Sequence, residues 1–256
     1  PKNSISSVYG ILKLHRENNP IRPIQTSYDS LVNNTEKFLV KLFEPLKEHM
    51  EYAIDSEKAF KERLMIEKHL FNPKIHEICS FDVTQLYPSV NVKRVIAFIL
   101  QQISKEPEKF FNFENSEGQI MPVPPISKFR EFLEAVFTKY NIFKCLSGTY
   151  RQKDGLPMGS SISPLLASLY VSMMESSVIK ELQKSGHVVI WLRYADDCFA
   201  VIRKRSSEKV LQAINAWDTP LKFTIEKMVE NKINFLDSQV FLKTVKLSSR
   251  NTGKTD

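Results

Sequence analysis

The sequence predicts an α+β fold in which an antiparallel sheet is covered by helices on one face. Apolar runs of strand length and amphipathic helical patterns follow one another in mixed order: strand, helix, hairpin, long helix, hairpin, helix and strands. Two of the runs, His187–Tyr194 and Cys198–Ile202, are separated only by Ala195-Asp196-Asp197, which is typical of a β-hairpin. Because a hairpin joins two antiparallel strands, the predicted hairpins favour an antiparallel sheet.

The composition excludes several classes of protein. Hydrophobic residues make up 42% and charged residues 25% of the 256 residues, a balance that excludes a disordered chain. No apolar run approaches the ~18 residues of a membrane span, and three widely spaced cysteines predict neither a disulfide framework nor a zinc site. No signal peptide opens the sequence, so we expect an intracellular protein, nuclear or cytoplasmic. The net charge of +7 favours an anionic partner such as nucleic acid.

The elements of the first half follow from periodicity. Residues 1–27 are loop- and strand-like, and a charged helical stretch follows over about residues 28–70, interrupted near Pro45 and Asp55. Residues 75–83 form an apolar run of strand length. The next helix begins after Asn91, a plausible N-cap, and its apolar residues recur at helical spacing: Val92, Val95, Ile96, Ile99 and Ile103.

The second half continues with a proline-rich loop over residues 106–126, an amphipathic helix over 129–140 and a strand-like segment over 141–151 with a turn. A long helix is predicted to begin near Ser160 or Ser163, with Pro164 in its first turn. After the hairpin come a helix over Ser206–Trp217 and two strands, 221–229 and 233–242. These elements complete the predicted sheet and its helices.

Adjacent carboxylates at Asp196 and Asp197, between two apolar runs, are the strongest chemical signal in the sequence. An exposed Asp-Asp turn is one interpretation, because aspartate is a good turn residue. The other is a divalent cation that keeps both groups ionised. Asp82 lies in a third apolar run, where a lone aspartate is otherwise a cap or an ion-pair partner. If its strand lies beside the hairpin, three carboxylates converge, as two-metal phosphoryl transfer requires.

The segment Gln152–Pro164 lies between these carboxylates. Gly155 and Gly159 permit the backbone to approach a ligand closely, and the following helix N-terminus suits an anion or a nucleotide edge. The alternative is an ordinary loop followed by a capped helix. The segment lacks GxxxxGK[ST], so a P-loop is not supported.

Three segments together resemble the reverse transcriptase family. Phe81–Tyr87 is similar to its motif A, Gln152–Pro164 to motif B (Q-x-x-G-x-P-x-G-S-x-x-S-P) and Tyr194–Asp197 to the Y-x-D-D of motif C. The finer resemblance is to Penelope-like retroelement enzymes. It rests on Tyr9–His15 with Ile21–Ile24, where Leu12 replaces a common proline, and on Phe223–Glu226 with Asn231–Asp237. The resemblance implies an RNA-directed DNA polymerase that adds dNTPs to a DNA primer on an RNA template.

The resemblance also implies residue roles. Asp82, Asp196 and Asp197 would be catalytic and would hold two Mg²⁺ ions, which Mn²⁺ can replace. Tyr87 would be the steric gate against a ribose 2′-OH, although a core tyrosine is the alternative. The remaining assignments are to the dNTP (Lys13, Arg22, Gln152 and Gly155) and to nucleic acid (Met158, Gly159 and Ser160). For Lys13 a solvated basic loop is equally open, and Lys227 or Lys232 would serve as the motif D lysine.

A right-hand fold is implied, with fingers over residues 1–78, palm over 79–105, a fingers/palm insertion over 106–150, palm over 151–245 and a tail over 246–256. Few residues follow Asp237, so the thumb is expected to be missing or truncated, and no GIY-YIG endonuclease motif is present. Two alternatives stay open. One is a catalytically silent, domesticated module that binds RNA or DNA. The other is a viral-type RNA-dependent RNA polymerase, which Tyr87 argues against.

Overall fold

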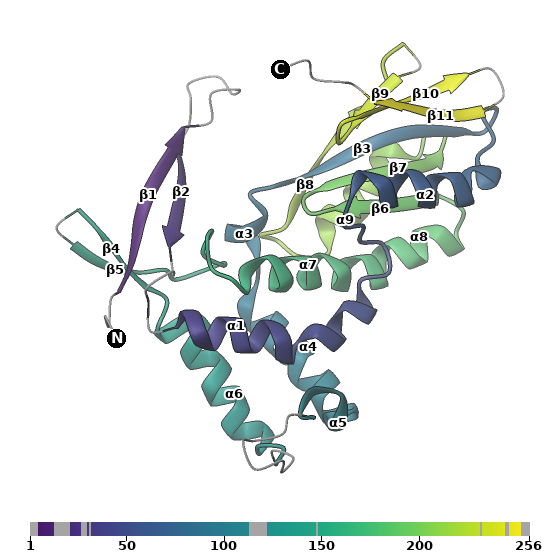
Figure 1. Cartoon of the computed structure of the whole chain (residues 1–256). Coiled ribbons are helices and arrows are strands. Elements are labelled where there is room, and N and C mark those ends of the chain that lie inside the picture. The colour runs from purple at the N-terminus through teal and green to yellow at the C-terminus, as the bar shows by residue number, and fades with distance from the viewer. Residues whose placement is uncertain are drawn as a thin grey trace. The chain divides into compact units, whose positions relative to one another are not determined.

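The computed structural model describes residues 5–12, 21–26, 30, 32–112, 122–146, 148–230, 232–243 and 246–251. It has the predicted α+β class (Figure 1). The chain folds into two compact units, Pro1–His49 with Tyr87–Tyr170 and Met50–Leu86 with Val171–Asp256. Over the described residues, no helix is long and apolar enough to cross a membrane. The predicted subdomain boundaries and the predicted state of the thumb stay predictions.

The first unit contains a four-stranded sheet in the order β2-β1-β4-β5. Its strands are β1 (Ser6–Leu12), β2 (Ile21–Thr26), β4 (Ile142–Cys145) and β5 (Gly148–Arg151). The β1–β2 and β4–β5 pairs are antiparallel, and β1 meets β4 in parallel through a short contact. The strand-like prediction for residues 141–151 is confirmed as a hairpin.

Helices build the core of the first unit. They are α1 (Asn33–Leu42), a 3₁₀ helix (Glu44–His49), α4 (Val92–Lys105), α5 (Pro107–Phe110) and α6 (Ile126–Glu134) with a π-helical turn (Ala135–Lys139). Two more helices cross the boundary between the units: α3 (Leu86–Ser89) and α7 (Ser163–Met174). The predicted cap is confirmed, because Arg94 N donates to Asn91 Oδ1 at 3.2 Å, and the predicted apolar face of α4 is buried. The loop predicted for 106–126 is wrong at its start: α5 forms there because Pro107 occupies a first-turn position, where its missing N–H costs nothing.

The second unit is built on an antiparallel sheet in the order β6-β7-β3-β8. The strands are β3 (His76–Thr84), β6 (Val188–Tyr194), β7 (Asp197–Arg203) and β8 (Lys222–Lys227). The helices are α2 (Glu57–Glu67) with a 3₁₀ turn (Lys68–Leu70), α8 (Lys180–Lys184) after a π-helical turn (Glu175–Ile179), and α9 (Ser207–Ala216). The strand and hairpin predicted for residues 75–83 and 187–202 are confirmed.

The central strand β7 is buried on both faces. One face packs in a core cluster with Phe60 and Leu64 of α2. Phe60 lies edge-on to Phe199, with ring centroids 5.1 Å apart. The run Cys198–Ile202 is fully buried, which explains why it reads as a continuous apolar segment rather than an alternating one.

A second sheet in this unit, in the order β11-β10-β9, corrects one prediction. The segment 233–242 is not one strand but two, β9 (Lys232–Phe235) and β10 (Ser238–Lys243), and β11 (Lys246–Asn251) follows. The turn between β9 and β10 contains Leu236, whose φ is 55°. A leucine in the left-handed region carries no turn signal in the sequence, so the hairpin could not be predicted.

Candidate active site

Asp82 and Asp197 lie directly opposite each other on neighbouring strands. β3 and β7 pair antiparallel, and their register ends with Asp82 opposite Asp197. Side chains of directly opposed residues lie on the same face of a sheet. The structure therefore confirms that the Asp82 strand lies beside the hairpin, and it brings two of the predicted carboxylates together.

Asp196 occupies the turn that joins β6 to β7. Tyr194 pairs with Asp197 across the turn, and Ala195 has φ 52°, a left-handed conformation of the kind that a tight hairpin turn needs. The carbonyl of Asp196 accepts a hydrogen bond of 3.0 Å from Val83 N. The turn is thereby tied to the residue that follows Asp82, which places the third carboxylate at the same end of the sheet.

The three carboxylates interact electrostatically. The pKa of Asp197 is raised from 3.8 to about 6, first by partial burial and then by the negative charges of Asp196 and Asp82. Among the described residues, no lysine, arginine or histidine makes an ion pair with Asp196 or Asp197. The turn is exposed to solvent, as the interpretation of Asp196-Asp197 as a simple exposed turn required. However, it lies next to a third carboxylate, that of Asp82.

Carboxylates in this arrangement fit a divalent cation. In the described part of the chain, no three His, Cys, Asp or Glu side chains are close enough to hold an ion by themselves. Mg²⁺ in phosphoryl-transfer sites is bound through one or two carboxylates, with waters and substrate phosphates as its other ligands. The raised pKa of Asp197 is the observation that fits such an ion: burial and, after it, the charges of Asp196 and Asp82 disfavour the ionised carboxylate, and a cation favours it.

A buried charged cluster, absent from the sequence-based expectations, lies next to this turn. Arg193 and Glu175 are both fully buried, with Arg193 Nε donating to Glu175 Oε1 at 2.8 Å and Nη2 donating to Oε2 at 3.2 Å. Trp191 Nε1 also donates to Glu175 Oε1, at 2.9 Å. The available signal was an arginine in an apolar strand and a glutamate in the apolar helical run after motif B.

The motif B-like segment lies in the first unit and packs against backbone there. Leu156 N donates to Tyr87 O at 2.8 Å, and Gln25 N donates to Met158 O at 2.7 Å. Gly155 and Gly159 have φ of 72° and 107°. A Cβ on Gly159 would lie 2.4 Å from Gln25 O. Both glycines permit a close approach, but the approach seen here is to the chain's own backbone at Tyr87 and Gln25, and an approach to a ligand stays a prediction.

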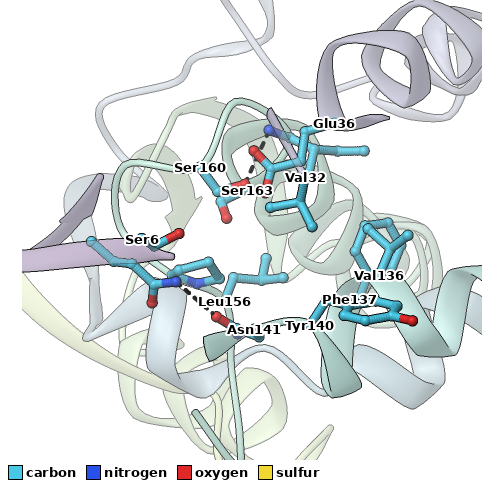
Figure 2. A pocket seen from close by; sticks show the side chains of 13 residues that line it. Ser6, Val32, Glu36, Val136, Phe137, Tyr140, Asn141, Leu156, Ser160 and Ser163 are labelled. Atoms are coloured by element: carbon cyan, nitrogen blue, oxygen red, sulfur yellow. Dashed lines mark hydrogen bonds between the residues drawn. The ribbon is translucent and has the colours of Figure 1, made fainter. Parts of the chain in front are cut away.

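A small pocket lies behind this segment (Figure 2). Ser160 and Ser163 gather with Glu36 at one end of it, and Asn141 lies toward the other (Figure 2). Glu36 Oε2 accepts from Ser161 N at 3.1 Å. The pocket offers about 20 Å³ to the centre of a water-sized sphere, which is room for a single water.

The other predicted residues take separate positions. Arg22 lies on β2, exposed, and pairs with Ile11. Gln152 Nε2 donates to Asp154 O at 2.9 Å, and Tyr87 is half-buried in the first unit. Lys13 lies outside the described residues. The longer helix begins at Ser163, as predicted, but the Ser163 hydroxyl caps nothing: it is buried without a hydrogen-bond partner in the described part of the chain.

Of the two candidates for the motif D lysine, Lys227 lies on β8, exposed, 3.5 Å from Glu208, and Lys232 begins β9. Neither position decides between them. The structure thus brings together Asp82, Asp196 and Asp197 in the second unit and, separately, Tyr87 with Gly155 in the first.

The sequence is similar to known proteins. Residues 13–242 match the family model described as reverse transcriptase (RNA-dependent DNA polymerase). Telomerase reverse transcriptase of the mouse (Mus musculus) is 37% identical over 65 residues, which are 25% of this chain and 6% of that protein.

Two solved telomerase structures from Candida tropicalis share the fold. The one truncated from its C-terminal domain has a TM-score of 0.68 at 15% identity, over 98% of this chain and 56% of that chain. The one in complex with a fragment of telomeric RNA has a TM-score of 0.70 at 13% identity, over 99% and 45%. This chain spans about half the length of these structures. At such identities the likeness shows the fold, a right-hand polymerase fold, as predicted.

A family model that covers most of the chain, on a fold shared with solved polymerases, leaves one conclusion: the chain belongs to the reverse transcriptase family.

Proposed function

We propose that this chain is the fingers and palm part of an RNA-directed DNA polymerase, which transfers nucleotides from dNTPs to a primer 3′-OH on an RNA template. The observation that carries the proposal is the register of β3 with β7, which puts Asp82 opposite Asp197 beside the Asp196 turn. Family membership supports the reaction class. The RNA bound by the Candida tropicalis telomerase supports RNA as the partner.

In this proposal Asp82 and Asp196 hold two Mg²⁺ ions, and Asp197 adds negative charge beside them. The ions, when bound, supply charge neutralisation for an attacking hydroxyl and a leaving pyrophosphate. The protein's own contribution is position: a strand pair and a tight turn hold the carboxylates, so little reorganisation is needed on binding. The exposed turn leaves the carboxylates open to a triphosphate.

Selection of the sugar is assigned to Tyr87. Its backbone carbonyl is held by Leu156 N at 2.8 Å, so the motif B-like segment fixes the position of the gate. Tyr87→Ala should let NTPs be incorporated alongside dNTPs. Unchanged discrimination in this variant would remove Tyr87 from the proposal, and NTP use by the parent protein would favour the viral-type RNA polymerase.

The Penelope-like subfamily is proposed on Tyr9–His15 with Ile21–Ile24 and on Phe223–Glu226 with Asn231–Asp237. The described parts of the first two segments are the paired strands β1 and β2, with Arg22 opposite Ile11, and the third lies in β8. A fingers role for Arg22 follows from the bidentate fit of guanidinium to phosphate. Arg22→Ala should raise the KM for dNTP more than it lowers kcat.

Primer extension on an RNA template tests the proposal. The parent chain should extend a DNA primer in the presence of Mg²⁺, and Asp196→Ala should abolish extension. Asp55→Ala is the matched control, because it removes another exposed aspartate of the same unit, whose one described side-chain bond is to Ser56. Equal activity of parent and Asp196→Ala would refute the site. RNA binding without extension by any variant would favour the silent module.

A further inference from the structure

Arg193 is a fully buried arginine two residues before the exposed turn of the candidate site. Beyond its bidentate pair with Glu175, Nη2 donates to Ser172 Oγ at 2.9 Å. A buried ion pair usually contributes no more stability than apolar residues of the same volume, because removing the two charges from water is costly. Stability alone therefore does not account for a buried arginine here.

The backbone of Arg193 is also held on both sides. Arg193 N donates to Tyr52 O at 2.8 Å, and Ile54 N donates to Arg193 O at 2.8 Å. The side chain is oriented by Glu175 through a two-bond fork, a geometry that lysine cannot reproduce. Both ends of the residue are thus fixed relative to the sheet.

A further bond of the guanidinium reaches the turn itself. Arg193 Nη1 donates to Ala195 O at 3.2 Å. The next carbonyl, that of Asp196, is held by Val83 N at 3.0 Å. The carbonyls before and after the Asp196 Cα are therefore each held by a hydrogen bond, one from the Arg193 side chain and the other from the Val83 backbone. These two bonds restrict the conformation of Asp196. Ala195, just before the first of these carbonyls, adopts φ 52°, a conformation that costs a non-glycine residue about 1 kcal/mol.

We propose that Arg193, oriented by Glu175, is a positioning residue that clamps the Ala195 carbonyl and so holds the Asp196 carboxylate beside Asp82. The clamp fixes the conformation of the turn whether or not a metal binds there. Its effect on metal binding rests on the proposed function. Loss of the clamp frees the turn to leave its left-handed conformation, which moves the carboxylate although the strands stay paired.

Two variants separate a clamp from a purely structural ion pair. Arg193→Met with Glu175→Leu removes both buried charges together, so the unpaired-charge penalty of a single change is avoided. Trp191→Phe is the matched control. It removes the hydrogen bond of 2.9 Å from Trp191 to the same Glu175, and it leaves the hydrogen bond from Arg193 to the Ala195 carbonyl intact.

The first measurement is amide hydrogen exchange by NMR at Val83, whose N–H reports directly on the Asp196 carbonyl. In the double variant we expect exchange at Val83 to rise about tenfold or more, while amides within β7 such as Val201 keep their rates. The second measurement is Mn²⁺ binding by EPR on the same protein. The dissociation constant should rise by about tenfold, as for other residues that orient metal ligands.

Trp191→Phe should lower the melting temperature and leave both the Val83 rate and the Mn²⁺ affinity at parent values. A double variant with parent values for Val83 and Mn²⁺ would overturn the proposal. If the double variant does not fold, Arg193→Lys decides, because an ammonium cannot bind Glu175 in a fork and also reach Ala195. Faster Val83 exchange in a chain whose parent binds no Mn²⁺ would uphold the clamp and refute the proposed metal site.

Discussion

Gly155 offers the sharpest single-residue prediction. Its φ is 72°, and a Cβ built there would lie 2.6 Å from both Cα and O of Pro88 and 2.7 Å from Tyr87 O. All of these are backbone atoms, so no side chain can swing away. Gly155→Ala must therefore displace the segment from the start of α3 and weaken the bond from Leu156 N to Tyr87 O.

The cost has two parts. A left-handed φ costs alanine about 1 kcal/mol relative to glycine, and overpacking against rigid neighbours costs about 1–3 kcal/mol more. Gly186 isolates the first part, because its φ is 69° but no atom lies within 4 Å of a built Cβ. We expect Gly155→Ala to lower the free energy of unfolding by about 2–4 kcal/mol, and Gly186→Ala by about 1 kcal/mol.

Urea unfolding followed by circular dichroism measures both variants against the parent. Primer extension with dNTPs and NTPs then tests whether the displaced Tyr87 backbone impairs sugar selection. Equal destabilisation by the two alanines would refute the reasoning, because it would show that the Pro88 contact imposes no steric cost. A large loss in Gly186→Ala would refute it equally.

Three further predictions concern single groups. The raised pKa of Asp197, about 6, means that its ionisation opposes folding, so the metal-free protein should lose stability as pH rises from about 4 to about 6. Asp197→Asn should remove this dependence in melting curves recorded with a chelator, and an unchanged slope would contradict it. Glu36→Ala leaves Ser161 N without its 3.1 Å acceptor and should cost about 1–3 kcal/mol in urea unfolding, against near-neutrality for Glu62→Ala on exposed α2 surface. Asn91→Ala should cost about 1 kcal/mol by the same measurement, because it removes the N-cap of α4, while Asn91→Asp should retain most of it.

Local signals made much of the fold predictable. The buried face of α4 follows from apolar residues at helical spacing, and the β6–β7 hairpin follows from two apolar runs around a short polar turn. The carboxylate pair was visible because Asp196-Asp197 interrupts an otherwise apolar stretch. The pairing of Asp82 with Asp197 was predictable only as a condition, since strand order depends on contacts between distant segments.

What the sequence could not disclose is long-range and side-chain specific. Glu36 and Ser161 are 125 positions apart, and nothing in the helical pattern of α1 marks Glu36 as a buried acceptor. Arg193 and Glu175 are each a lone charge in an apolar run, but only the structure shows that they are buried together and paired with each other. The β9–β10 hairpin was missed because its turn uses Leu236 rather than glycine or asparagine.

In the candidate site, carboxylates that repel one another lie on a turn whose backbone is held by hydrogen bonds. Ionisation of Asp197 raises the free energy of the folded state, because its carboxylate is partly buried and lies near the charges of Asp196 and Asp82. The turn nevertheless keeps its conformation, because Val83 holds one carbonyl, Arg193 holds the other, and β7 is buried on both faces.

A cation that relieves the repulsion should bind the folded chain more tightly than the unfolded one, and should therefore stabilise it. We expect Mn²⁺ at neutral pH to raise the melting temperature of the parent protein and to have little effect on Asp82→Asn with Asp196→Asn. That variant should also melt above the metal-free parent, since it removes the repulsion at its source. A variant less stable than the metal-free parent would show that the carboxylates are stabilised by partners within the fold, and that the strained site inferred here does not exist.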